Sequence, residues 1–269
     1  MPTLITRLGG VNFTAPGLPV LKSLTKGFVS EGLVSLYRFN DAATGALKNE
    51  APGGADTGVA TVGAAGDSAT LLAGGGIRLK GTAHVPNGVN TDLSLPFTVM
   101  MHATFVVPAP NVYQGLIGTV AYPQRGFSWY AQADANPPAA TYLSNIFRPS
   151  KNGAQGSNSQ VAGATAFNYG NPRTLALTWD GASFRVSVWN SGALVKDKIV
   201  AVPLAEIATN SSGQVSNLVR IAFGSTSTLF PGVDMILDVG ALYNRVLTDT
   251  EIVSNDYAGI SLRVSRPAR

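Results

Sequence analysis

The chain has 269 residues, of which 45% are hydrophobic and only 13% are charged, and it contains no cysteine. That length supports a substantial hydrophobic core, and the lack of cysteine excludes a disulfide framework, a zinc ribbon, an iron–sulfur cluster and a thiol nucleophile. The formal charge of +4 is too small for the basic stripe of a nucleic-acid-binding domain, so we expect no nucleic acid partner.

Residues 1–30 differ in pattern from the rest of the chain. They contain Pro16, Pro19 and several glycines, and they show no sustained period of 2 or 3.6 residues. We therefore predict an extended N-terminal arm, which either wraps its own domain or docks on a neighbour in an assembly. The first ten residues lack a basic segment followed by an apolar one, which predicts no secretory signal. No stretch approaches the roughly 18 consecutive apolar residues of a membrane span, so we expect no membrane insertion.

Residues 31–262 carry the pattern of an all-β domain. Short runs of β-branched, aromatic and leucine residues alternate with turn-forming clusters, and no long helical patterns separate them, which favours an antiparallel sandwich over a parallel sheet. The expected strands are 33–40, 76–80, 97–107, 115–121, 127–133, 173–179, 183–189, 193–200, 218–223 and 235–243. Residues 51–69 and 135–172 are expected to be long loops, which often carry binding.

The clearest hairpin turns at Asp180-Gly181, because both residues tolerate a positive φ. Period-2 alternation sorts its side chains onto two faces. The predicted core face carries Leu175, Leu177, Trp179, Phe184, Val186 and Val188, and the opposite face carries Arg185, Ser187 and Trp189.

One short helix is predicted near the C-terminus. Thr248 and Glu251 have the spacing of a capping box, Leu247 and Ile252 that of a hydrophobic staple, and Gly259 is a plausible stop. Residues 263–269 form a basic tail, interpreted as solvated or, as the alternative, as a partner-binding arm.

Several segments resemble the laminin G-like, concanavalin A-like jelly-roll superfamily of lectins and glucanases. The resemblance covers about Gly32 to Leu262 and is carried by residues 32–41, 97–105 and 177–195 and, most specifically, by Asp-Val-Gly-Ala-Leu-Tyr-Asn-Arg-Val-Leu-Thr-Asp-Thr-Glu-Ile at 238–252. It implies a two-sheet antiparallel jelly-roll sandwich. It implies less about activity, since the superfamily contains lectins, glycoside hydrolases, adhesion modules and structural domains of bacteriophage particles.

The residues argue against catalysis. Glycosidases of this superfamily carry a Glu-x-Asp-x-x-Glu strand that supplies two carboxylates at a fixed separation, and this motif is missing. Asp234 and Asp238 would stand about 13 Å apart on a continuous strand. Only His84 and His102 could supply an imidazole base, and His102 sits in an apolar strand where a structural role is expected. We therefore predict a chain that is not an enzyme and has no catalytic residues.

A resident metal is not expected either. Calcium takes six to eight hard oxygens, and the aspartates that could contribute show no dedicated loop spacing. These are Asp41, Asp56, Asp92, Asp134 and Asp180. We predict no cofactor, with calcium the one ion that the resemblance allows.

Sugar binding needs exposed aromatic rings beside amide or charged groups. Alternation places Tyr130 and Trp189 opposite the core faces of their strands, with Gln132 and Arg185 beside them. These four residues are the predicted ligand site. The alternative is that the arm or a neighbouring subunit covers both outer faces.

The resulting hypothesis is a non-enzymatic bacteriophage virion protein, displayed on a tail, fibre or capsid. Its expected partners are other virion proteins, further copies of itself in a homo-oligomer, and a host surface polysaccharide. A capsid decoration protein, a soluble bacterial carbohydrate-binding module and a glycoside hydrolase without the usual acidic motif are the alternatives. The expected location is the virion.

Overall fold

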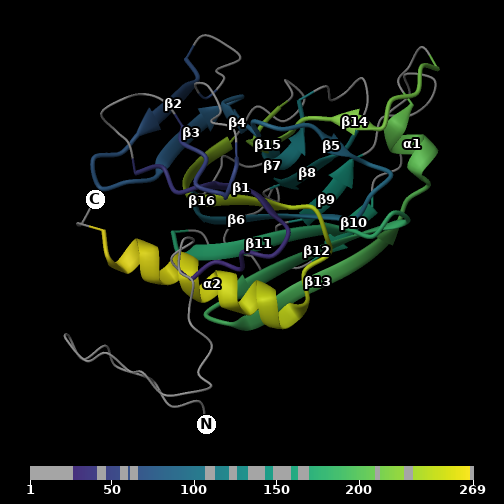
Figure 1. Ribbon diagram of the computed structural model, residues 1–269. Coiled ribbons are helices and arrows are strands. Elements are labelled where there is room, and N and C mark those ends of the chain that lie inside the picture. The colour runs from purple at the N-terminus through teal and green to yellow at the C-terminus, as the bar shows by residue number, and fades with distance from the viewer. Residues whose placement is uncertain are drawn as a thin grey trace, which may run out of the picture.

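The alternating strand pattern builds two antiparallel sheets that pack face to face (Figure 1). The computed structural model describes residues 27–40, 47–54, 60, 66–106, 113–120, 126–132, 143–147, 159–162, 170–209, 213–226 and 233–266. The predicted all-β sandwich with a C-terminal helix is confirmed. Residues 1–26 of the expected arm lie outside the described residues.

The larger sheet has eight strands. In spatial order it runs β13 (Ala193–Ala201), β12 (Ser183–Asn190), β11 (Pro172–Trp179), β6 (Phe97–Phe105), β16 (Val233–Tyr243), β3 (Ile77–Gly81) and β2 (Ser68–Leu71), with β1 (Leu33–Tyr37) also paired to β16. The strands β1 and β3 share one side of β16, because β1 pairs with its second half and β3 with its first half. The edge strand β13 is exposed along most of its length.

The smaller sheet has six strands, and two further strands form a separate ribbon. The six run β10 (Ser159–Ala162), β9 (Leu143–Phe147), β8 (Ser128–Gln132), β7 (Tyr113–Thr119), β15 (Ile221–Gly224) and β4 (His84–Pro86), and the ribbon joins β14 (Leu218–Val219) to β5 (Thr91–Asp92). The strands β9 and β10, and the first two residues of β2, lie in stretches that we expected to be loops. That expectation was wrong for these strands, because the abundance of Gly, Ser and Asn hid their pairing.

The main core fills the space between the two sheets. It contains the predicted inner face of the hairpin: Leu175, Leu177, Trp179, Phe184, Val186 and Val188. Phe184 packs 4.6 Å from Trp179 and 4.7 Å from Phe127, measured between ring centroids, which joins the larger sheet to the smaller one. The expected turn at Asp180 is confirmed, with Gly181 at φ 99° and Oδ1 of Asp180 accepting the amides of Ala182 and Ser183.

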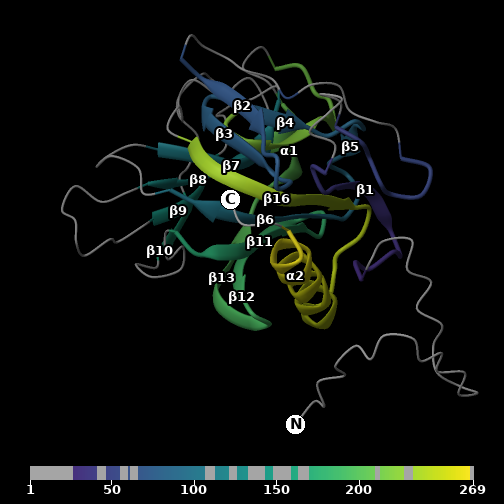
Figure 2. The same cartoon turned by 90° about the vertical axis from the view of Figure 1, so that its left-hand side faces the viewer.

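A second core covers the outer face of the larger sheet. Figures 1 and 2 show helix α2 (Asp249–Val264) lying against this sheet on the side away from the smaller one. The covered set includes Met100, Ala176, Trp189, Ala241 and Ile252, together with Phe28 from the segment before β1. An apolar part of the outer face is thus buried by the chain's own helix, which accounts for part of the low charge content.

Helix α2 begins as the sequence predicts and ends later. The capping box of Thr248 and Glu251 is formed, and Leu247 and Ile252 lie in the same apolar cluster, as expected of a staple. The predicted stop at Gly259 was wrong, because the helix continues to Val264 and Gly259 instead lets His102 pack closely against it. A short second helix, α1 (Leu204–Ala208), was not expected.

Two arginines in the described part of the basic tail form ion pairs within the chain. Arg263 lies in the last turn of α2, and both it and Arg266 bond to Asp238. Arg269 lies outside the described residues. Neither described helix is both long and apolar enough to cross a membrane.

Candidate functional site

A pocket of about 200 Å³ opens where the end of β16 and the start of β6 meet β1 and the segment around β5. This end pocket is lined by Val34, Asn90, Thr91, Asp92, Leu95, Pro96, Phe97, Leu242, Tyr243 and Asn244. Clefts for drug-sized ligands hold roughly 300–1,000 Å³. The end pocket therefore suits a ligand group about as large as one sugar ring.

The core holds the backbone of the end pocket in place. Trp179 donates a hydrogen bond from Nε1 to the carbonyl oxygen of Leu93 at 2.7 Å, and the amide of Leu93 donates to the carbonyl oxygen of Asn217 at 2.8 Å. Thr91 and Asp92 are paired in β5 immediately before this anchor. Their side chains consequently project from a fixed strand.

The polar groups of the end pocket differ in exposure. Asn90 and Asn244 are exposed, and each brings an amide that both donates and accepts. Thr91 is only 8% exposed, and its Oγ1 has no hydrogen-bond partner among the described residues. Such an unsatisfied buried hydroxyl is uncommon in folded proteins, and a ligand or a water molecule at this position would satisfy it.

Asp92 brings a carboxylate. Its Oδ1 accepts the amide of Ser94 at 2.9 Å and the hydroxyl of Ser94 at 2.7 Å. These two hydrogen bonds lower the pKa of Asp92 below its ordinary value, so the group is ionised at neutral pH. Beside it Leu95 is 58% exposed, which gives the rim an apolar surface.

The structure places two of the predicted ligand residues on the outer face of the larger sheet, but beneath α2. Trp189 is 3% exposed and donates from Nε1 to Oγ of Ser187 at 2.9 Å. Arg185 forms ion pairs with Asp197, at 3.2 Å, and with Asp249 in the first turn of α2. The exposure expected of Trp189 was therefore wrong, because the helix covers that face.

Tyr130 and Gln132 belong to β8, away from the first two. Tyr130 is 2% exposed, so the ring face expected to meet a ligand is also buried. The backbone of Gln132 pairs with Tyr113 and Leu143, and its side chain lies outside what the structure describes. The four predicted residues therefore do not form one site, and ligand binding by them stays a prediction without support from exposure.

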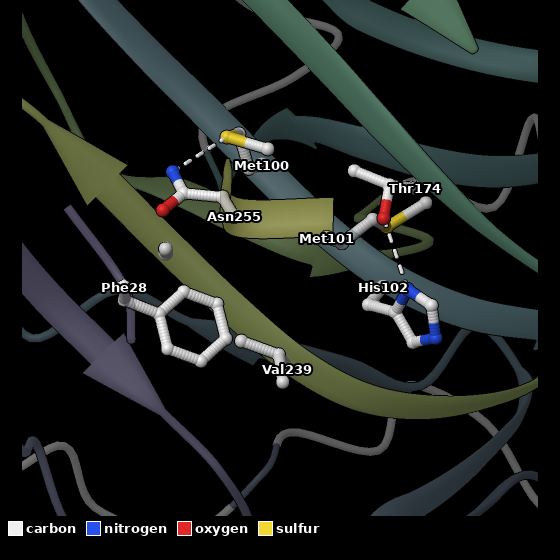
Figure 3. Close-up of a pocket in the computed structure, with 8 residues that line it drawn as sticks. Phe28, Met100, Met101, His102, Thr174, Val239 and Asn255 are labelled. Carbon is white, nitrogen blue, oxygen red and sulfur yellow. Dashed lines mark hydrogen bonds between the residues drawn. The ribbon is translucent and has the colours of Figure 1, made fainter. Parts of the chain in front are cut away.

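A cavity of about 10 Å³, room for one water molecule, lies under α2 beside His102 (Figure 3). The Nδ1 of His102 lies 2.9 Å from Oγ1 of Thr174, whose hydroxyl donates to Oδ1 of Asp256 at 2.7 Å. Since the threonine proton points to the carboxylate, Nδ1 of the neutral imidazole is the donor. Burial lowers the pKa of His102, so this buried imidazole is neutral, in the structural role expected of it.

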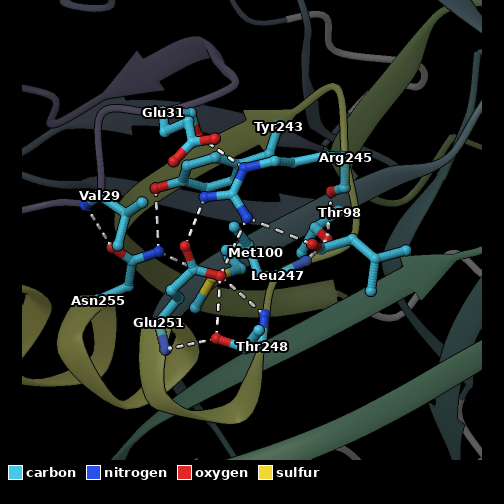
Figure 4. Close-up of polar contacts among 11 residues, drawn as sticks. Val29, Glu31, Thr98, Met100, Tyr243, Arg245, Leu247, Thr248, Glu251 and Asn255 are labelled. Carbon is cyan, nitrogen blue, oxygen red and sulfur yellow. Dashed lines mark hydrogen bonds and ion pairs between the residues drawn. The ribbon is translucent and has the colours of Figure 1, made fainter.

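A second polar cluster joins the start of α2 to the sheet and to the segment before β1 (Figure 4). Asn255 donates to the hydroxyl of Tyr243 at 2.9 Å and accepts the amide of Val29 at 2.8 Å. Arg245 donates to Glu251 at 3.0 Å. These contacts hold α2 against the larger sheet, so the outer face of this sheet is buried beneath the start of the helix.

The acidic residues do not form the dyad that we weighed. Asp234 pairs with Arg78 at 3.1 Å, whereas Asp238 is fully buried at a β-bulge and bonds to Arg263 and Arg266. Within the described ranges, no three His, Asp or Glu side chains gather closely enough to hold a metal ion. Asp41, Asp56 and Asp134, three of the weighed calcium ligands, lie outside those ranges.

No protein-family model matches the chain, and no curated protein matches it significantly. Solved structures do match. Trypanosoma rangeli sialidase superposes with a TM-score of 0.55 at 15% identity, over 86% of this chain and 33% of the sialidase chain. The binding domain of botulinum neurotoxin DC, in complex with rat synaptotagmin II, gives 0.51 at 12% identity, over 86% of this chain and 52% of that chain.

The chain thus spans about a third of the sialidase chain and about half of the toxin binding domain. At such identities the likeness shows the fold alone, an antiparallel β-sandwich. It nevertheless corrects one prediction. The claim that the chain is not an enzyme is contradicted, because a sialidase, which is an enzyme, contains this fold although only 15% of the aligned residues are identical. The missing Glu-x-Asp-x-x-Glu strand therefore excludes nothing, and we withdraw that claim.

The residues that line the end pocket were mostly missed by the sequence analysis. Asp92 was weighed only as a calcium ligand, and Asn90, Thr91 and Asn244 were not singled out. Asn90 precedes β5 and Asn244 follows β16, at strand ends where polar residues commonly form turns, while Thr91 and Asp92 form the short strand β5 itself. Only the long-range pairing of β16 with β1 and β6, and of β5 with β14, brings them together, and a single sequence carries no signal for that.

Proposed function

We propose that the chain is a lectin-like recognition domain that binds a glycan of a host cell surface in the end pocket. The observation that carries the proposal is the combination of one carboxylate, one buried hydroxyl and two exposed amides beside apolar surface, in a pocket of about 200 Å³. Sugars offer hydroxyl groups to such donors and acceptors and an apolar ring face to such surface. Similar folds have been solved with sialic acid and with synaptotagmin II, a sugar and a protein.

The test is binding to an array of bacterial surface glycans by the full chain and by two variants, Asp92→Ala and Asn244→Ala. We expect each variant to lose about tenfold in affinity, because each removes a polar contact from the end pocket. Asp180→Ala is the matched control, since Oδ1 of Asp180 also accepts two turn donors but lies outside the lining. The proposal fails if no glycan binds, or if Asp180→Ala weakens binding as much as Asp92→Ala does.

The setting that we propose for this recognition is the bacteriophage virion, with further copies of the chain and other virion proteins as neighbours. Its support is the sequence resemblance to a superfamily that includes structural domains of phage particles. A capsid decoration role is the alternative within that setting. Mass spectrometry of purified virions tests the proposal: the chain should be present in a copy number set by the particle's symmetry, and its absence would overturn the setting while leaving glycan recognition standing.

A further inference from the structure

The end pocket carries one charge. Among the described residues that line it, Asp92 is the only one ionised at neutral pH, because burial raises the pKa of Tyr243 and the other side chains are amides, a hydroxyl or apolar groups. The pocket therefore has a net negative charge of one, with no cation in its lining.

Several carboxylates elsewhere in the described ranges pair with arginine. Asp234 pairs with Arg78, and Glu251 pairs with Arg245. Asp92 has no such partner among the described residues, and the only side chain that hydrogen-bonds to it is Ser94, through Oδ1. Its Oδ2 is left to solvent or to a ligand.

We infer, on the basis of the proposed function, that the sugar bound in the end pocket carries a free amino group, whose ammonium form pairs with Oδ2 of Asp92. An ammonium group is the complement of a carboxylate without a counter-ion, and charge-assisted hydrogen bonds are roughly twice as strong as neutral ones. A sugar acid, by contrast, would place a second carboxylate beside Asp92, with no arginine in the lining to offset the repulsion.

Thr91 supplies an independent reason to expect a ligand here. Thr91 lines the same pocket, and its Oγ1 is buried and has no hydrogen-bond partner among the described residues. A hydroxyl of the sugar ring would satisfy it, which fixes the ring beside Asp92 through a second, uncharged contact.

The experiment compares four methyl glycosides by calorimetry or saturation-transfer NMR: glucosamine, N-acetylglucosamine, glucose and N-acetylneuraminic acid. The first three differ only at one substituent, so their comparison isolates the amine. We expect the glucosamine glycoside to bind about tenfold more tightly than the glucose glycoside, and this preference to weaken as salt is raised. The neuraminic acid glycoside should bind weakest.

The variant Asp92→Asn keeps the oxygen that accepts from Ser94 and removes the charge, so it preserves the local turn. It should abolish the preference for the amine while leaving affinity for the glucose glycoside within about twofold. The control Asp180→Asn should keep the preference intact.

The outcomes separate the two proposals. Equal binding of all four glycosides, lost in Asn244→Ala, would overturn the amine preference and leave glycan recognition standing, as would a preference that survives in Asp92→Asn. Binding of none of the glycosides, together with an empty glycan array, would overturn both.

Discussion

Arg266 donates a hydrogen bond from Nη1 to Oδ1 of Asp238 at 2.8 Å, which ties the residues just past α2 to the middle of β16. Asp238 is fully buried at the bulge where the pairing of β16 with β6 shifts register. Arg266 also donates to the carbonyl oxygen of Arg38. One guanidinium thus links the end of α2 to β16 and to the residue that follows β1.

Arg266→Ala should destabilise the protein by about 3 kcal/mol, because removing one member of a buried pair leaves the other charge buried and poorly compensated. Arg263→Ala is the control: its side chain is 34% exposed and lies 3.4 Å from Asp238, so the loss should be clearly smaller. Urea denaturation at pH 7 measures both. Equal losses in the two variants would contradict the assignment of Arg266 as the main partner.

Glu251 predicts a stability change in acid. Hydrogen bonds from Arg245 and Thr248 lower its pKa from 4.5 to about 2. Because the pKa in the folded state lies below the unfolded value, its contribution to stability is complete above about pH 4.5 and declines as the pH falls towards 2. The difference in unfolding free energy between the wild type and Glu251→Gln should therefore shrink over that interval. A difference that stays constant from pH 5 to pH 2.5 would argue against the pair.

The two histidines predict a second pH range in which the stability of the protein changes. Burial is the main cause that lowers the pKa of both His84 and His102 below 6.5. The unfolded chain then binds more protons than the folded one below about pH 6.5, so stability falls as the pH drops below that value. The slope of the unfolding free energy against pH should decrease by up to about 1.4 kcal/mol per pH unit for each histidine replaced by glutamine. Chemical denaturation between pH 7 and pH 5 measures it, and an unchanged slope in the double variant would contradict this account.

Gly259→Ala should destabilise the protein, although alanine normally favours a helix over glycine by about 1 kcal/mol. A Cβ at this position would lie 2.9 Å from Cγ of His102, and relieving such overpacking typically costs about 1–3 kcal/mol. Ser254→Ala, at an exposed position of α2, should be neutral or slightly stabilising. Thermal melting compares the two, and a higher melting temperature for Gly259→Ala would show that the helix can shift at little expense.

The sequence predicted the parts of the fold that depend on local pattern. Alternation in 173–189 correctly assigned both faces of the hairpin, and the spacing of Thr248 and Glu251 correctly placed the start of α2. It did not predict that α2 folds back over the larger sheet. For that reason Trp189 was interpreted as a ligand residue, although its ring lies in a second core.

The candidate site was much less predictable, for a topological reason. Asn90 and Asn244 are separated by most of the domain, and they meet only because β16 lies between β1 and β6. Polar residues at strand ends are common in any sandwich. Which ends converge is decided by long-range pairing, and a pattern of period 2 does not encode it.

The exposed edge strand β13 limits how copies of this domain can associate. Its centre reads Lys196-Asp197-Lys198. Suppose that two copies joined their β13 strands antiparallel, related by a two-fold axis at this centre. One of these three residues would then lie opposite the same residue of the other copy. With the axis at Asp197, each Lys196 would also face a Lys198. Like charges opposite each other oppose pairing. The charges at this edge therefore oppose extension of the sheet by a second copy centred on these residues.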